Sequence, residues 1–150
     1  MLHPDFKDML SEFIDSAVDF MLVGAYALAA HGYPRSTGDI DIWVRADKHT
    51  GPLVYDCLSR FGAPLHDLTV DDLSTPGIVF QIGVPPVRID ILTKIDGVLF
   101  EDAWANRTTV DWDGLKIPVI GLADLIKNKR STGRTKDLAD AEQLETNLGE

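Results

Sequence analysis

The chain has 150 residues and a formal net charge of -10, and 45% of its residues are hydrophobic. This length and composition fit one globular domain, residues 1–150, that buries its own core. The negative charge argues against general DNA binding, and no apolar run approaches the roughly 20 residues of a membrane-spanning helix. The start of the chain lacks the basic and apolar segments of a signal peptide. The single cysteine, Cys57, fits a reducing compartment. We therefore expect a cytoplasmic protein without a membrane partner.

The first third of the chain predicts helices that alternate with strands. Apolar residues recur at three- and four-residue spacing after Pro4, which is typical of an amphipathic helix. A continuous apolar run that ends at Gly24 predicts a buried strand, and the small-residue helix after it should end at Gly32. The predicted elements are a helix from Pro4, a strand at 20–23, a short helix at 25–30 and a strand at 39–44.

The remaining two thirds predict three further helices and four strands. Asp113-Gly114 is a dipeptide that favours a tight hairpin turn, and Gly83-Val84-Pro85-Pro86 joins a second hairpin-like pair. Residues 62–77 carry turn-forming residues and predict a loop or a short irregular helix. The predicted elements are helices at about 50–61, from 121 to about 132 and at about 136–144, a weak helix or lid at 97–106, and strands at 78–82, 87–92, 108–112 and 115–120.

Three aspartates lie in strands that alternate apolar and acidic residues. Asp39 and Asp41 are two residues apart in one strand, and Asp90 lies in another with the same Ile-Asp-Ile pattern. In such strands the isoleucines take the core face and the aspartates share the other. Carboxylates that converge in a cleft repel one another unless a cation neutralises them. A lone Asp-x-Asp is common on exposed strands, but the second strand favours a Mg²⁺ site used in phosphoryl or nucleotidyl transfer.

Two segments next to the acids offer phosphate-binding groups, each with a structural alternative. Gly24 precedes a helix start, where backbone amides suit phosphate oxygens, although a glycine between strand and helix is more often turn chemistry. Arg35 and Thr37 directly precede the acidic strand and suit contact with phosphate or an aspartate. The structural alternative is that Arg35 only offsets the local negative charge. His31 is interpreted as a packed or capping residue.

Basic residues cluster between positions 127 and 136, where they form either a solvated helix end or an anion site. Lys129 is the preferred functional residue, because an ammonium near a triphosphate neutralises developing charge. Asp137 and Asp140 lie on one side of the last predicted helix. Structural pairing with Arg130 or Arg134 accounts for both of these aspartates.

The segment from Leu22 to Asp41, LVGAYALAAHGYPRSTGDID, resembles the polymerase-β-like nucleotidyltransferase superfamily. The likeness is to its small prokaryotic branches, the AbiEii-type toxins and the minimal nucleotidyltransferases, and it runs from about residue 20 to residue 142. The motifs that are most similar to this branch are Arg35-x-Thr37-x-Asp39-Ile40-Asp41 and Lys129-Arg130…Gly133-Arg134-x-Lys136-Asp137.

The resemblance implies an α+β (α/β) fold, with a mixed sheet backed by helices, and three acids that bind two Mg²⁺ ions. Asp39, Asp41 and Asp90 match these acids, and in related enzymes the third helps to activate the attacking hydroxyl. Gly24 matches the first residue of the turn that holds the triphosphate, and Lys129 matches a basic residue of the late helix. Ala25 departs from the pattern, because the family turn usually has a second glycine or a serine there. Alanine retains the backbone amide but has no hydroxyl.

The leading hypothesis is a Mg²⁺-dependent nucleotidyltransferase that moves a nucleoside monophosphate from a triphosphate to a hydroxyl acceptor. The acceptor is a tRNA end, a protein side chain or a small molecule, and the resemblance suits the toxin, or modifying partner, of a toxin–antitoxin pair. One alternative is a nucleotidyltransferase fold that has lost its chemistry and serves as an antitoxin or partner scaffold, which Ala25 favours. Another is a structural Ca²⁺ or Mg²⁺ site without nucleotide.

Overall fold

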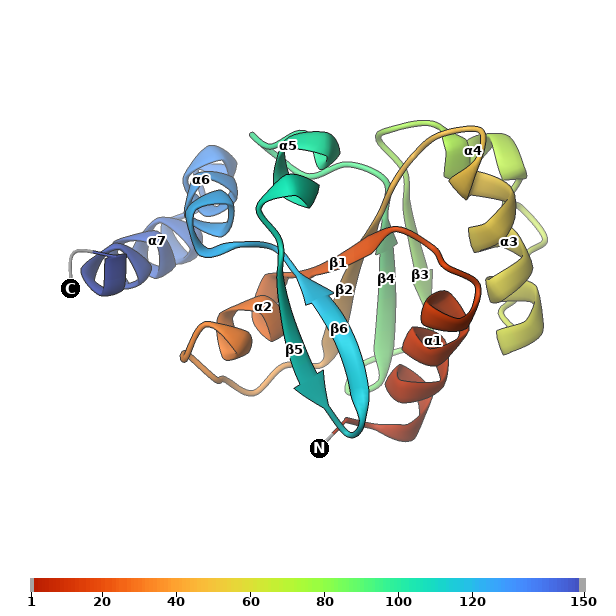
Figure 1. Cartoon of the computed structure of the whole chain (residues 1–150), viewed down its shortest axis with the longest axis horizontal. Coiled ribbons are helices and arrows are strands. Elements are labelled where there is room, and N and C mark those ends of the chain that lie inside the picture. Colours follow the sequence, from red (N-terminus) through yellow and green to blue (C-terminus); the bar gives the residue numbers. More distant parts are fainter. Residues whose placement is uncertain (1, 149–150) are drawn as a thin grey trace.

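A computed structural model describes residues 2–148 and shows one mixed α/β domain built on a six-stranded sheet (Figure 1). The strands lie in the order β3-β4-β2-β1-β6-β5. β1 pairs in parallel with β6, and β2 pairs in parallel with β4, whereas the other neighbours are antiparallel. The strands are β1 (Phe20–Val23), β2 (Asp39–Val44), β3 (Val79–Ile82), β4 (Arg88–Leu92), β5 (Thr108–Trp112) and β6 (Leu115–Val119).

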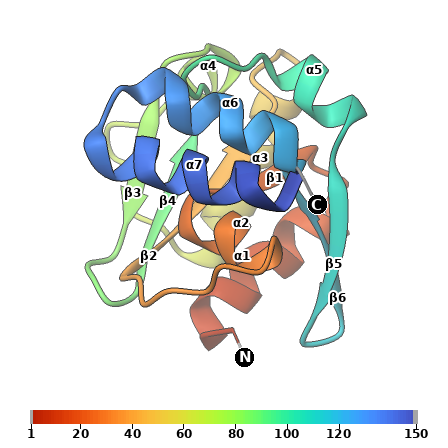
Figure 2. The same ribbon diagram turned by 90° about the vertical axis from the view of Figure 1, so that its left-hand side faces the viewer.

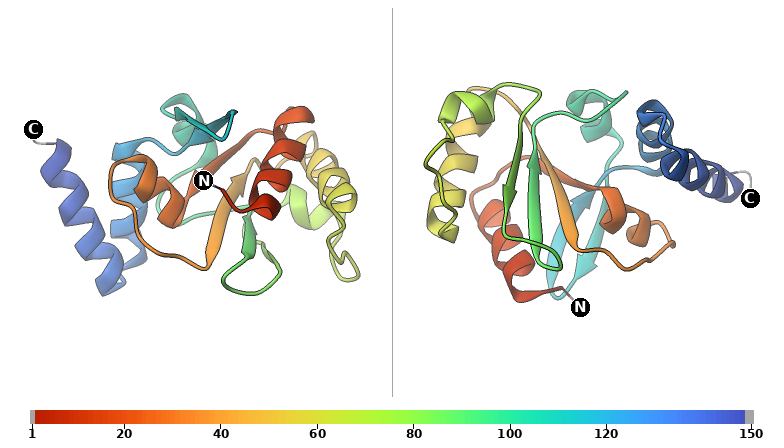
Figure 3. Two further views of the ribbon diagram at one scale, coloured as in Figure 1. Left: turned by 90° about the horizontal axis from the view of Figure 1, so that it is seen from below. Right: turned by 180° about the vertical axis from the view of Figure 1, so that it is seen from behind.

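Helices cover both faces of the sheet. Figure 2 shows α2, α6 and α7 in front of the strands, and Figure 1 shows α1, α3 and α4 on the opposite face. α5 lies near one end of the strands, as the views from below and behind confirm (Figure 3). The helices are α1 (Pro4–Asp15), α2 (Gly24–Ala30), α3 (Thr50–Phe61), α4 (Val70–Ser74), α5 (Phe100–Ala105), α6 (Leu122–Thr132) and α7 (Thr135–Leu148). Within residues 2–148, no helix combines the length and the apolar character that crossing a bilayer requires.

The predicted alternation in the acidic strand is confirmed. Ile40 and Ile42 of β2 are fully buried, whereas Asp39 and Asp41 are half-buried on the other face. That other face is covered by α2, α6 and α7 (Figure 2). Trp43 continues the aspartate side of the strand and is buried. One strand therefore supplies both core packing and polar side chains for a site.

The predicted elements agree with the structure apart from their ends. α2 begins at Gly24 and is capped at His31, one residue before the predicted Gly32, and α7 begins at Thr135 and continues to Leu148. The region predicted as loop or irregular helix holds the short α4. Asp113 and Gly114 have φ values of 52° and 81°, which is the positive φ that a tight hairpin turn requires. Cys57 is buried in α3.

Candidate active site

The three predicted aspartates lie together on adjacent parallel strands. In the register of β2 and β4, Asp41 stands opposite Asp90, and Asp39 stands opposite Arg88. One carboxylate oxygen from each aspartate can be chosen so that all three lie within 4.8 Å of one another. Asp90 is buried, with 5% of its surface exposed. The expected convergence of these acids is confirmed, while their catalytic roles remain predictions.

The ionised form of Asp41 is disfavoured in this cluster. Burial raises the pKa of Asp41 to about 8, and the negative charges of Asp39 and Asp90 contribute to the same shift. A carboxyl group with such a pKa is largely protonated near neutral pH when nothing compensates its charge. A nearby cation would reverse this shift, because it favours the ionised carboxylate.

Gly24 and Thr37 set the positions of two of these carboxylates. Gly24 has a φ of +65°, and a Cβ built on it would overlap Asp41 Oδ2 and lie 3.0 Å from Asp41 Cγ. Any larger residue would therefore displace Asp41 as well as strain the backbone. The hydroxyl of Thr37 is 3.0 Å from Asp39 Oδ1 and donates to it. Thr37 thus orients an aspartate, which is one of the two roles predicted for it.

Arg88 is a member of this site that the sequence analysis did not single out. Its Nε donates to Asp90 Oδ1 at 2.8 Å, and its Nη2 donates to Asp90 Oδ2 at 3.0 Å. Nη2 also lies 3.3 Å from Asp39 Oδ2. The two-residue spacing of Arg88 and Asp90 could have indicated this contact, because such residues share one face of a strand.

A cavity of about 580 Å³ adjoins the acidic cluster. Asp39 and Asp41 form one side of it, together with Gly24 and Ala25 at the start of α2. The facing side comes from α6 and α7, which Figure 2 shows in front of β2 and β4. The basic residues that line the cavity are Arg35, Lys94, Lys129, Arg134 and Lys136.

Lys129 and Arg35 line this cavity, but both have carboxylate partners. Lys129 is buried, and its Nζ lies 3.1 Å from Asp137 Oδ1 and 3.4 Å from Asp140 Oδ2. Arg35 binds Asp140 through two hydrogen bonds of 2.6 and 3.2 Å. These pairs join α6, α7 and the loop before β2, so both residues help to hold the cavity wall in place. Whether either also contacts a triphosphate stays a prediction.

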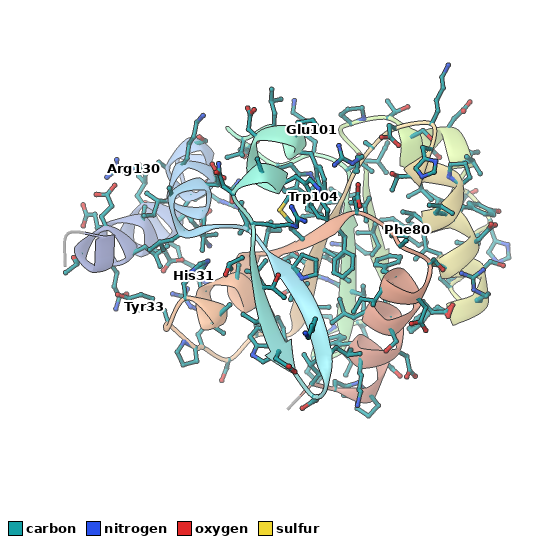
Figure 4. The ribbon with its side chains drawn as sticks, viewed as in Figure 1. His31, Tyr33, Phe80, Glu101, Trp104 and Arg130 are labelled. Carbon is teal, nitrogen blue, oxygen red and sulfur yellow. The ribbon has the colours of Figure 1, made fainter. Side chains whose placement is uncertain are left out.

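The predicted pairing of the two late aspartates is half correct. Asp137 accepts from Arg134 at 2.8 Å, as expected. Burial acts to raise the pKa of Asp137, but hydrogen bonds from Thr132 and Lys129 outweigh it and lower the pKa. The pairing of Asp140 was predicted wrongly, because helix spacing alone suggests partners on α6 whereas Arg35 arrives from a distant loop. Arg130 points to Glu145 instead, at the outer side of the helix pair (Figure 4).

The loop between α2 and β2 is also tied to α7. Tyr33 donates from its hydroxyl to the backbone oxygen of Gln143 at 3.2 Å. His31 Nε2 lies 2.8 Å from the backbone oxygen of Ile120, which agrees with its predicted packing or capping role. Figure 4 shows both side chains at the end of α2. The loop that leads into Asp39 is therefore held at several points.

Two exposed lysines supply the cavity with positive charge that has no ion-pair partner among the described residues. Lys94 follows β4, and Lys136 lies in the first turn of α7. Lys136 belonged to the predicted basic cluster, whereas Lys94 was missed because it stands alone in the sequence. Their ammonium groups are suited to bind an anion such as a phosphate.

A second cavity of about 780 Å³ lies at the carboxyl ends of β2 and β4. Trp43 and Phe100 line it, with their ring centroids 5.0 Å apart. Leu99 at its edge is 72% exposed. Lys94 and Ile95 line both cavities, so the two hollows adjoin. This cavity is large enough for a small organic molecule.

The donor set of the acidic cluster fits a hard divalent cation such as Mg²⁺. Asp39, Asp41 and Asp90 offer oxygen atoms only, and these atoms converge within the span that one ion could bridge. Burial, followed by the charges of Asp39 and Asp90, raises the pKa of Asp41, and a bound cation would oppose this shift by favouring the ionised carboxylate. When bound, such an ion would polarise a phosphoryl oxygen and neutralise charge on a polyphosphate.

Comparison with known proteins identifies the family. The family model described as "Nucleotidyl transferase of unknown function (DUF2204)" matches residues 3–149. TM1012 of Thermotoga maritima, provisionally named a nucleotidyltransferase, is 17% identical with a TM-score of 0.62 over 99% of this chain and 96% of that chain. An antigenic nucleotidyltransferase-like protein of Paracoccidioides brasiliensis is 14% identical with a TM-score of 0.55 over 93% and 74%.

These two similarities show a shared fold, and no protein of curated function matches the chain. The family match spans almost the whole sequence and includes every residue of the acidic cluster. The chain therefore belongs to the DUF2204 family of nucleotidyl transferases of unknown function.

Proposed function

We propose that this protein is a Mg²⁺-dependent nucleotidyltransferase that moves a nucleoside monophosphate from a nucleoside triphosphate to a hydroxyl acceptor. The observation that carries the proposal is the meeting of Asp39, Asp41 and Asp90 on two adjacent strands beside a cavity with basic residues. Three half-buried or buried carboxylates are costly without a cation. Mg²⁺ ions held by such carboxylates are a common means of phosphoryl transfer.

The residues that line the cavity divide into two groups with different tasks. Asp39 and Asp41, which line the cavity, would hold the metal together with Asp90 beside them, and two ions is the number that the family resemblance implies. The ammonium groups of Lys94 and Lys136, which form no ion pair within residues 2–148, would bind the triphosphate. Lys129 and Arg35 instead hold α6, α7 and the loop before β2 together. Gly24 leaves room for the Asp41 carboxylate, which occupies the space that a Cβ would take. This arrangement would place a polyphosphate between the sheet and α6–α7.

The proposed reaction is an in-line displacement at the α-phosphorus. The acceptor oxygen forms a bond to phosphorus, the bond from phosphorus to the β-phosphate oxygen breaks, and pyrophosphate leaves with that oxygen. The hydroxyl proton passes to a base, for which Asp90 is the candidate. Arg88 donates one hydrogen bond to each oxygen of Asp90, which lowers the basicity of the carboxylate, so a weaker contact with Arg88 would favour this proton transfer.

The acceptor is an RNA end, a protein side chain or a small molecule. The adjoining cavity with Trp43 and Phe100 provides room for an apolar or aromatic part of either substrate. The resemblance to AbiEii-type toxins supports a role as the toxin or modifying partner of a toxin–antitoxin pair. A small regulator encoded by the neighbouring gene would support this role further.

Label transfer tests the proposed activity directly. The protein is incubated with each α-³²P-labelled nucleoside triphosphate, Mg²⁺ and a cell extract. We expect label to enter a macromolecular or small-molecule fraction with the wild-type protein and to be lost with Asp39→Asn. Asp56→Asn is the matched control, because Asp56 is exposed on α3 on the opposite face of the sheet.

The alternative is a binding module that uses the fold without chemistry. Ala25 favours it, since alanine offers no hydroxyl to a phosphate at a position where the family usually has glycine or serine. No transfer to any fraction with any nucleotide would support this alternative, provided that the protein still binds triphosphate in a calorimetric titration.

A further inference from the structure

The guanidinium of Arg88 lies inside the acidic cluster and already provides a positive charge there. It donates to both oxygens of Asp90, at 2.8 and 3.0 Å, and lies 3.3 Å from Asp39 Oδ2. Asp90 is 5% exposed and the Arg88 side chain is 29% exposed, so water screens these hydrogen bonds only in part. A bidentate pair of this kind is among the stronger charge-assisted contacts in proteins.

A metal ion at Asp90 would compete with Arg88 for the same oxygens. Both oxygens of Asp90 accept hydrogen bonds from the guanidinium, whereas among residues 2–148 no cationic side chain forms an ion pair or hydrogen bond with Asp41. Asp41, and Asp39 through Oδ1, which among the described residues accepts only from the neutral hydroxyl of Thr37, are therefore the ligands for which Arg88 does not compete. An ion that used both oxygens of Asp90 would have to displace Arg88 and leave its charge beside a cavity that already holds other cationic side chains.

The charge balance supports the same conclusion. Three ionised carboxylates are neutralised by one divalent cation together with the single charge of Arg88. A second divalent cation would leave an excess of positive charge beside Lys94 and Lys136 until an anion such as a triphosphate arrives. Arg88 thus neutralises part of the carboxylate charge that a second ion would otherwise neutralise.

We propose that Arg88 takes the place of the second divalent cation in the nucleotide-free protein, so that the acidic cluster holds one ion through Asp39 and Asp41. This inference rests on the proposed function, since it assumes that the cluster binds a catalytic metal. It makes Arg88 a positioning residue that acts on Asp90. It also gives Asp90 a different state before and after the nucleotide binds.

The test is the number of Mn²⁺ ions bound per chain, measured by isothermal titration calorimetry and by electron paramagnetic resonance without nucleotide. We expect one ion for the wild-type protein and two for Arg88→Met. Arg88→Gln is the second variant, because its amide can still donate to buried Asp90 if the methionine variant fails to fold. Arg60→Met is the charge-matched control, since Arg60 pairs with Glu12 on α1, on the opposite face of the sheet, and it should bind one ion.

A double variant locates the second ion. Arg88→Gln combined with Asp90→Asn should bind one ion again, because the ligand that Arg88 had occupied is gone. Two ions in the wild-type protein, or one ion in both Arg88 variants, would overturn this inference while leaving the proposed function standing. The absence of bound Mn²⁺ from all of these proteins would overturn both.

Discussion

Gly24 lies against the carboxyl group of Asp41, so closely that a Cβ on Gly24 would overlap Asp41 Oδ2. The first residue of α2 and the second acid of β2 are therefore a matched pair. The sequence analysis assigned Gly24 to the approach of a phosphate. The structure adds a separate reason for glycine, which is the space that Asp41 occupies.

Gly24→Ala should weaken both folding and metal binding. The φ of +65° alone costs an alanine roughly 1–2 kcal/mol, and displacement of Asp41 adds to this cost. The measurements are urea unfolding and Mn²⁺ affinity. Gly62→Ala is the control, because Gly62 also has a positive φ but nothing lies within 4 Å of its Cβ position. It should lose stability but keep wild-type metal affinity, and equal metal affinity in both variants would contradict the argument.

Asp41 should make the stability of the metal-free protein depend on pH. Burial, followed by the charges of Asp39 and Asp90, raises its pKa in the folded protein to about 8, whereas an aspartate in an unfolded chain titrates near ~3.9. The folded state thus binds more protons between these two values, and the free energy of unfolding falls as pH rises through that window.

The measurement is urea unfolding in EDTA between about pH 4.5 and pH 8.5. Asp41→Asn removes the titrating group, and its stability should fall less steeply over that range than that of the wild-type protein. Mg²⁺ should restore wild-type stability at high pH, because it binds the ionised carboxylate in the folded state. Parallel pH profiles for the two proteins would show that Asp41 does not titrate as proposed.

Lys129→Met should destabilise the protein by about 1–3 kcal/mol. The substitution removes an ammonium that two buried aspartates, Asp137 and Asp140, share, although each keeps an arginine partner. Arg130→Met is the control on the same helix, because the Arg130–Glu145 pair is exposed and should contribute less than about 1 kcal/mol. The measurement is the thermal unfolding of the two variants. Equal losses of stability would contradict a structural role for Lys129.

Lys94→Gln and Lys136→Gln should each weaken the binding of a triphosphate. Both ammonium groups line the cavity without an ion-pair partner in the described chain, and an exposed charge of this kind contributes up to about 1 kcal/mol, or about fivefold in affinity. Calorimetric titration with inorganic tripolyphosphate measures the effect. Lys116→Gln on β6 lies outside both cavities and should bind as the wild-type protein does. Unchanged affinity in the first two variants would leave the phosphate site without its proposed cations.

The sequence was sufficient to predict the elements and the three acids, for local reasons. Alternation in residues 39–44 and 87–92 places the acidic side chains on one face of each strand, whatever the strand order. The order of the strands in the sheet could not be predicted from that alternation. β4 lies next to β2 although β3 comes between them in the chain, so the facing of Asp41 and Asp90 follows from tertiary pairing.

Partners of charged residues were harder to predict than positions of acids. Helical spacing pairs residues within one helix or its neighbour, and it correctly gave Arg134 to Asp137. Asp140 instead binds Arg35, which is 105 positions away in sequence. Arg88 was overlooked because an arginine among apolar residues carries no motif, and only the register of β2 and β4 shows that it reaches Asp39 as well.

The sharing of Lys94 and Ile95 between the two hollows has a consequence for inhibitor design. A compound with a chelating, anionic head would sit by the aspartates. An aromatic tail on the same compound would reach Trp43 and Phe100 past a single lysine. The head and the start of the tail would then lie along one strand, because Asp39, Asp41 and Trp43 alternate on β2.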